Sequence, residues 1–165
     1  MENSKHDLPL GDQERLIELL SLFLLVGMWI YVALKWSTLP ETIPHHFNLQ
    51  GEPDAWGGKA MIFLLPAIAL GTYLLLYFIG KMSPSTYNYP VKITEENKAY
   101  QYALAVMMLK ITNLWTMILM AYITWAIVEE AGGHKGALNG ALLWTIIGSL
   151  FVVLAGYIYL AKKAA

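Results

Sequence analysis

Residues 61–79 read MIFLLPAIALGTYLLLYFI and contain no charged side chain. A transmembrane helix needs about 20 mainly apolar residues to cross the hydrocarbon core of a bilayer, which is about 30 Å thick. Residues 137–161 form a second uncharged run, and two further apolar runs at 16–34 and 104–128 hold one charged residue each. The sequence therefore predicts an all-α integral membrane protein with four transmembrane helices.

The composition agrees with a membrane protein. Hydrophobic residues make up 57% of the chain and charged residues 14%, and the mean hydropathy is +0.48. A soluble domain is typically about 45–50% apolar and about 25% charged. The formal net charge of -1 argues against a nucleic-acid-binding protein, which would carry a basic patch or stripe. The absence of cysteine excludes disulfides, thiolate metal sites and cysteine nucleophiles.

The first apolar run could instead belong to a cleaved signal peptide. Signal peptides have a basic segment followed by an apolar stretch of about 7–15 residues. The run at 16–34 is longer, and acidic side chains outnumber basic ones over the first 18 residues. We therefore expect this run to remain as the first transmembrane helix.

The distribution of basic residues predicts the orientation, because cytoplasmic loops are enriched in Lys and Arg. With the N-terminus inside, eight basic residues lie on the inner side: Lys5, Arg15, Lys81, Lys92, Lys98, Lys110, Lys162 and Lys163. The outer side holds three: Lys35, Lys59 and Lys135. Both termini are therefore predicted to be cytoplasmic, and the loops at 35–60 and 129–136 face outward.

This topology predicts two units of two helices each. Residues 1–80 form the first unit, which contains the outer loop 35–60. Residues 81–165 form the second unit, which begins with a cytoplasmic loop at 81–103. Within this loop, Thr94 is expected to cap a helix that starts there and continues into the third span.

The first outer loop is unusual for a membrane loop. It reads WSTLPETIPHHFNLQGEPDAWGGK over residues 36–59. Pro40 and Pro44 restrict their own backbone and that of the preceding residues to extended conformations. Gly51, Pro53 and Asp54 form a strong turn combination. We therefore predict a short ordered extracytoplasmic loop, with a hairpin as one possible form.

Eleven positions of this loop resemble the signature of a bacterial membrane domain of unknown function. That domain opens the immunity proteins that protect Bacillus-type cells from the sporulation-delaying toxin. The matching residues are Leu39, Pro40, Ile43, Pro44, His46, Phe47, Asn48, Gly51, Pro53, Asp54 and Lys59. The resemblance implies a two-helix unit with this loop outside, in the plasma membrane of a bacterium. The resembled proteins are longer, and the Gly-Arg-Thr-like signature of their second domain is absent, because Arg15 is the only arginine here.

The loop also holds candidate metal ligands, because imidazole and carboxylate groups bind zinc and similar ions. The candidates are His46, Glu52 and Asp54, with Glu129, Glu130 and His134 of the second outer loop as further ligands. His45 would point away from His46 if the strand alternates regularly. In the alternative interpretation, Asn48 and Asp54 hold turns and Lys59 pairs with a carboxylate. We expect no enzyme and no cofactor, and the zinc-protease motif His-Glu-x-x-His does not occur.

Two polar residues interrupt the third apolar run. Lys110 and Asn113 are three residues apart and share one face of a helix. In one interpretation, the two side chains together contact an ion or a substrate. In the simpler interpretation, the Lys110 side chain extends to the inner interface of the membrane. In the fourth run, Gly136 and Gly140 have the G-x-x-x-G spacing that allows close helix packing.

Two functional hypotheses remain. The first is a non-catalytic protein that recognises an envelope-acting peptide at the outer loop, as the resemblance implies. Its aromatic contact surface would come from Trp36, Phe47 and Trp56. The second is a small transporter or a metal-handling membrane protein. The expected partners are the lipid bilayer and either a peptide toxin or a partner membrane protein, and not nucleic acid.

Overall fold

The computed structural model describes residues 11–165. Lys5, which was assigned to the inner side, and the start of the predicted first unit lie outside the described residues. The elements, with 3-10 helices labelled η, follow in chain order: α1 (Gly11–Lys35), β1 (Thr42–Phe47), β2 (Pro53–Gly58), η1 (Lys59–Phe63), α2 (Leu64–Lys81), η2 (Pro84–Thr86), α3 (Lys98–Ala131) and α4 (Gly140–Lys163).

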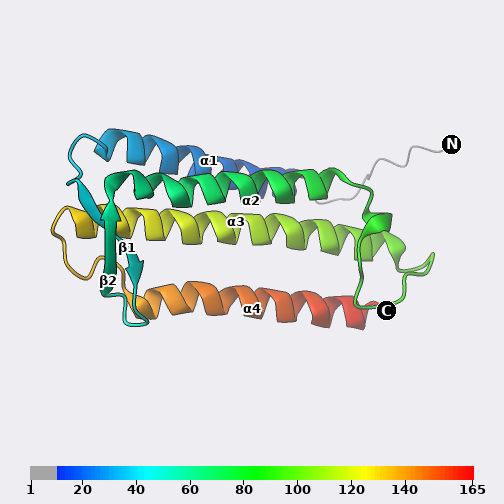
Figure 1. Cartoon of the computed structure of the whole chain (residues 1–165). Coiled ribbons are helices and arrows are strands. Elements are labelled where there is room, and N and C mark those ends of the chain that lie inside the picture. Colours follow the sequence, from blue (N-terminus) through cyan, green and yellow to red (C-terminus); the bar gives the residue numbers. More distant parts are fainter. Residues whose placement is uncertain (1–10) are drawn as a thin grey trace.

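All four predicted spans are confirmed as long helices. Each helix, with η1 continuing into α2, is long and apolar enough to cross a membrane, so the chain is a multi-pass membrane protein. The helices lie side by side as a bundle (Figure 1). The β1–β2 hairpin covers one end, called here the hairpin end, and the C-terminus lies at the opposite end (Figure 1).

Helix α3 is the centre of the bundle. It packs against α1, α2 and α4, whereas α4 packs mainly against α3. One buried cluster lies in mid-bundle and joins three helices through Met28, Ala69 and Met117. A second cluster lies under the hairpin and contains Val32, Ile43, Ile62 and Ile127, among others. The outer faces of the helices carry exposed leucine and phenylalanine side chains, which suit a hydrocarbon environment.

Polar contacts hold α4 against α3 at three levels. At the hairpin end, the backbone N–H of Asn139 donates to the Tyr122 hydroxyl at 2.8 Å. Midway along the helices, the Trp115 indole N–H donates to Ser149 Oγ at 2.8 Å. At the opposite end, Gln101 Nε2 donates to the Ala161 carbonyl at 2.8 Å. These bonds compensate for the few apolar side chains that α4 buries.

The predicted outer loop forms a true antiparallel hairpin. Thr42 pairs with Gly58 at its base, and Phe47 pairs with Pro53 near its tip. β1 packs against α3 and η1. The tip lies against the start of α4, where a Cβ on Gly51 would come within 2.1 Å of the Leu138 carbonyl oxygen. The hairpin therefore connects the first helix pair to the second.

Two sequence expectations need correction. The third helix begins at Lys98 and not at Thr94. Thr94 nevertheless caps the turn that leads into the helix, as expected. Its Oγ1 accepts from the Asn97 N–H, its own N–H donates to Asn97 Oδ1, and its carbonyl accepts from the Lys98 N–H. The connection between α2 and α3 therefore consists of residues 82–97.

The Gly136-x-x-x-Gly140 spacing also has a different role from the predicted helix packing. Gly136 lies before α4 with a φ of 76°, and Gly140 is the first residue of α4. A Cβ on Gly140 would come within 2.9 Å of the Leu49 carbonyl. Gly140 is therefore small because the hairpin tip approaches it, and not because another helix does.

Candidate functional site

The base of the hairpin is anchored by apolar side chains. Leu39 and Ile43 are buried in the cluster beneath it, and Pro44 is also buried. Pro40 is exposed just before β1, and Phe47 packs partly against the same cluster. Since Pro has no N–H, Pro44 suits a strand position where that donor is not needed. These signature residues therefore position the hairpin over the helix ends.

The tip of the hairpin is organised by Asn48. Its Oδ1 accepts hydrogen bonds from the backbone N–H groups of Gln50 at 3.0 Å and Glu52 at 2.9 Å. Its Nδ2 donates to the Glu52 carboxylate at 3.0 Å. Gly51 has a φ of 89°, a conformation that glycine adopts without steric cost. The turn interpretation of Asn48 agrees with this geometry.

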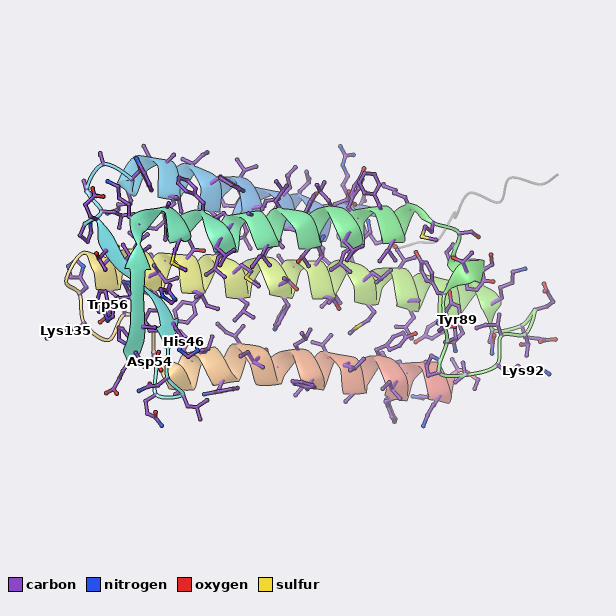
Figure 2. The ribbon with its side chains drawn as sticks, viewed as in Figure 1. His46, Asp54, Trp56, Tyr89, Lys92 and Lys135 are labelled. Carbon is purple, nitrogen blue, oxygen red and sulfur yellow. The ribbon has the colours of Figure 1, made fainter. Side chains whose placement is uncertain are left out.

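His46 and Asp54 face each other across the two strands. The distance between His46 Nδ1 and Asp54 Oδ1 is 2.5 Å, and both side chains are largely exposed. Figure 2 shows the pair near the start of α4. The strand register shifts between Pro44 and His46, so His45 is an extra residue in β1. This irregularity overrides the expected alternation, and both histidines line the same cavity.

Lys59 closes the base of the hairpin. Its ammonium lies 2.8 Å from Glu41 Oε1 and 4.9 Å from the centre of the Trp36 ring. Trp36 in turn packs against Phe63, with ring centres 5.0 Å apart. The predicted pairing of Lys59 with a carboxylate agrees with these contacts. Because Trp36 packs against Lys59 and Phe63, it offers a peptide less contact surface than the sequence suggested.

The structure brings only some of the candidate metal ligands of the hairpin close together. His46 is paired with Asp54, whereas Glu52 is engaged by Asn48. Over residues 11–165, no three His, Asp or Glu side chains form a group that could hold a metal ion.

The candidate ligands of the second outer loop make contacts of their own. Glu129 accepts a hydrogen bond from the Tyr31 hydroxyl at 3.0 Å and lies 2.8 Å from His134 Nδ1. Glu130 accepts a hydrogen bond from the backbone of Ala137. These residues tie the loop to α1 and shape the entry into α4.

Beneath β1 lies a cavity of about 220 Å³. Its roof consists of residues 43–47 of the hairpin. Its walls come from η1 and the adjoining start of α2, from α3 and from the loop before α4. They are formed by Met61, Leu64, Leu65, Ile123, Ile127 and Leu138. The lining is mainly apolar, so a ligand here would be held by burial of apolar surface. Sequence patterns gave no sign of this cavity, because its roof and walls together come from four separated segments.

A second group of polar side chains lies between the helices, toward the opposite end of the bundle. Lys110 Nζ lies 2.8 Å from Glu18 Oε2 and 3.5 Å from Glu14 Oε2, so the predicted lone lysine has two acidic partners on α1. Asn113 is buried beside it. The pairing of Lys110 with these glutamates was not predicted from the sequence, because Glu18 and Lys110 are 92 positions apart. Pairing explains how Lys110 is accommodated within an apolar helix.

Comparison with known proteins places the hairpin in a recognised sequence unit. Residues 23–70 match a domain of unknown function (DUF1648). This match contains the end of α1, the whole hairpin and the beginning of α2, and it supports the resemblance to a membrane domain. It does not extend to the immunity proteins themselves.

A relative from the archaeon Archaeoglobus fulgidus, described as an uncharacterized protein, is 32% identical over 105 residues. The alignment covers 56% of this chain and 57% of that relative. No solved structure matches the chain. Since this relative is archaeal, the bacterial membrane predicted from the sequence stays a prediction.

Proposed function

We propose that this chain is a non-catalytic membrane protein that binds an envelope-acting peptide at the hairpin and in the cavity beneath it. The observation that carries the proposal is the apolar cavity of about 220 Å³ under β1. An apolar cavity of about 150 Å³ is large enough to bind benzene. The cavity under the hairpin therefore has room for an aromatic or leucine side chain of a peptide.

The chemistry of the hairpin favours an apolar contact over a polar one. Three pairs of polar side chains at the hairpin engage one another: His46 with Asp54, Asn48 with Glu52, and Lys59 with Glu41. Beside these pairs, the Trp56 ring is 53% exposed on β2. Trp56 pairs with Pro44, which lines the cavity, so the exposed ring lies on the strand beside the cavity roof. An exposed tryptophan is a typical contact surface for a peptide at a membrane interface.

The test fills the cavity and measures peptide binding. The full chain is placed in lipid nanodiscs, and binding of a fluorescently labelled sporulation-delaying toxin peptide is measured. We expect Met61→Trp to weaken binding by about tenfold or more, because the larger side chain occupies the space that a peptide side chain would enter. Wild-type chain should also raise the survival of toxin-treated cells.

The matched control is Leu75→Trp, which adds the same ring on α2 at a side chain that is 60% exposed on the outer face. This variant should bind the peptide as the wild type does. Equal binding by the wild type, by Met61→Trp and by empty nanodiscs would contradict the proposal. Protein amounts in the membrane are matched in every comparison.

A further inference from the structure

Two imidazoles and one thioether meet at the cavity under the hairpin. His45 and His46 line it from β1, and Met61 lines it from η1. The other side chains of the lining are hydrocarbon. The nitrogen and sulfur atoms that this cavity presents from its side chains therefore come from these three residues.

Gly57 of β2 makes room for the sulfur and one imidazole beside each other. A Cβ on Gly57 would clash with Met61 Sδ and would lie 3.3 Å from His45 Nε2. Both atoms thus border the space that a side chain at residue 57 would fill. The side chain of His45 makes no hydrogen bond or ion pair within residues 11–165, so this imidazole is available to a ligand.

The neighbouring His46 is oriented by a carboxylate. Its Nδ1 lies 2.5 Å from Asp54 Oδ1, which leaves Nε2 as the nitrogen available to a ligand (Figure 2). Histidines that bind metal ions usually donate their other ring N–H to a carboxylate or a carbonyl in this way. Both histidines are exposed and Met61 is 38% exposed, so an ion can reach the three side chains from the outer surface.

We propose that His45, His46 and Met61 bind one Cu(I) ion at the rim of the cavity. A thioether is a soft ligand that selects Cu(I), and imidazole also binds copper. Zinc is less suited, because methionine is not among its usual protein ligands. The site does not depend on the peptide-binding function proposed above, although Met61 belongs to both.

The test measures Cu(I) affinity of the full chain in lipid nanodiscs without peptide. Copper is kept reduced with ascorbate under anaerobic conditions, and the chain competes for it with a coloured Cu(I) chelator. Met61→Leu removes the sulfur but keeps an apolar side chain of similar size. We expect this variant, His45→Gln and His46→Gln each to weaken Cu(I) binding by about tenfold or more. Zn(II) affinity should be the same in the wild type and Met61→Leu.

Two matched controls remove the same chemical groups elsewhere. Met82→Leu removes a thioether that is 53% exposed just after α2, at the opposite end of the bundle. His134→Gln removes an exposed imidazole of the second outer loop, whose Nδ1 is paired with Glu129. Both variants should bind Cu(I) as the wild type does.

X-ray absorption at the copper edge reports the ligands directly. The wild type should show sulfur and nitrogen neighbours, and Met61→Leu should lose the sulfur. Equal Cu(I) affinity in the wild type and the double variant His45→Gln/Met61→Leu would overturn the proposal. The same sulfur signal in the wild type and Met61→Leu would also overturn it. An equal loss of Zn(II) and Cu(I) affinity in Met61→Leu would contradict the assignment to a soft ion.

Discussion

At the scale of single residues, the meeting of Gly51 and Gly140 brings the hairpin tip and the start of α4 into close backbone contact. Gly51 combines a φ of 89° with a backbone contact to Leu138 and the start of α4. Either feature alone disfavours a side chain, and here both occur at one position. The sequence predicted a turn at Gly51 from its neighbours. It did not predict the role of Gly140, because that role depends on a segment about 90 positions away.

The first prediction concerns Gly51→Ala. The added methyl group would meet the Leu138 carbonyl oxygen at 2.1 Å, so the tip must move away from α4. We expect a loss of about 1–3 kcal/mol in the free energy of unfolding, from overpacking and from the strained backbone. Chemical denaturation in nanodiscs measures the loss.

Gly58→Ala is the matched control within the same hairpin. A Cβ there meets nothing within 4 Å, and the residue has an extended backbone with a φ of -61°. This variant should change the free energy of unfolding by less than about 0.5 kcal/mol. Similar losses in both variants would show that the contact with α4 contributes nothing.

At the scale of elements, the connection between α2 and α3 is held by aromatic side chains. The Tyr87 hydroxyl donates to the Ile79 carbonyl, and the Tyr89 hydroxyl donates to the Pro84 carbonyl, both at 2.7 Å. Tyr89 also stacks on Tyr102 of α3, with ring centres 5.6 Å apart. Burial raises the pKa of both hydroxyls above the ordinary value for tyrosine.

The second prediction follows from these raised pKa values. Because tyrosine is neutral when protonated, a raised pKa in the folded state stabilises the fold fully below the unfolded pKa, which is about 10. That stability is lost as the pH rises above about 10 and toward the folded pKa. The Tm should therefore fall as the pH rises above about 10, and Tyr89→Phe should reduce the pH dependence of the fall. An identical pH dependence in Tyr89→Phe would contradict this role.

Elements were predicted more reliably than their contacts. The four spans follow from apolar length, and the hairpin follows from prolines, Gly51 and the turn residues. The expected cap at Thr94 agrees with its hydrogen bonds to Asn97 and Lys98, although regular α3 begins only at Lys98. The cavity and the partners of Lys110 could not be predicted, because they depend on how separate helices are placed.

At the scale of the whole molecule, α4 is the least enclosed helix. It buries little of its surface and is held to α3 by hydrogen bonds near both ends and in the middle. The central bond, from Trp115 to Ser149, is partly buried midway along the two helices. Bonds of this kind between membrane helices contribute about 0.6 kcal/mol on average and at most about 1.7 kcal/mol.

The third prediction tests the central bond. Trp115→Phe keeps an aromatic ring but removes the indole N–H, so the free energy of unfolding should fall by about 0.5–1.7 kcal/mol. Trp125→Phe is the control, because Trp125 stacks on Tyr122 and its indole makes no hydrogen bond within residues 11–165. Denaturation by SDS in mixed micelles gives both values. An equal loss in the two variants would assign the effect to ring size alone.

The contact between the hairpin tip and α4 has a consequence for how this domain can be used in other chains. The segment 23–70 that matches DUF1648 ends inside α2, yet its hairpin rests on α3 and on the start of α4. Residues 23–70 therefore do not contain the whole surface on which their hairpin packs, because α3 and the start of α4 lie outside them. We expect another chain with the same hairpin to supply an equivalent packing surface, either from its own later helices or from a neighbouring subunit. A graft of residues 23–70 onto an unrelated helix pair would carry the signature without the folded hairpin.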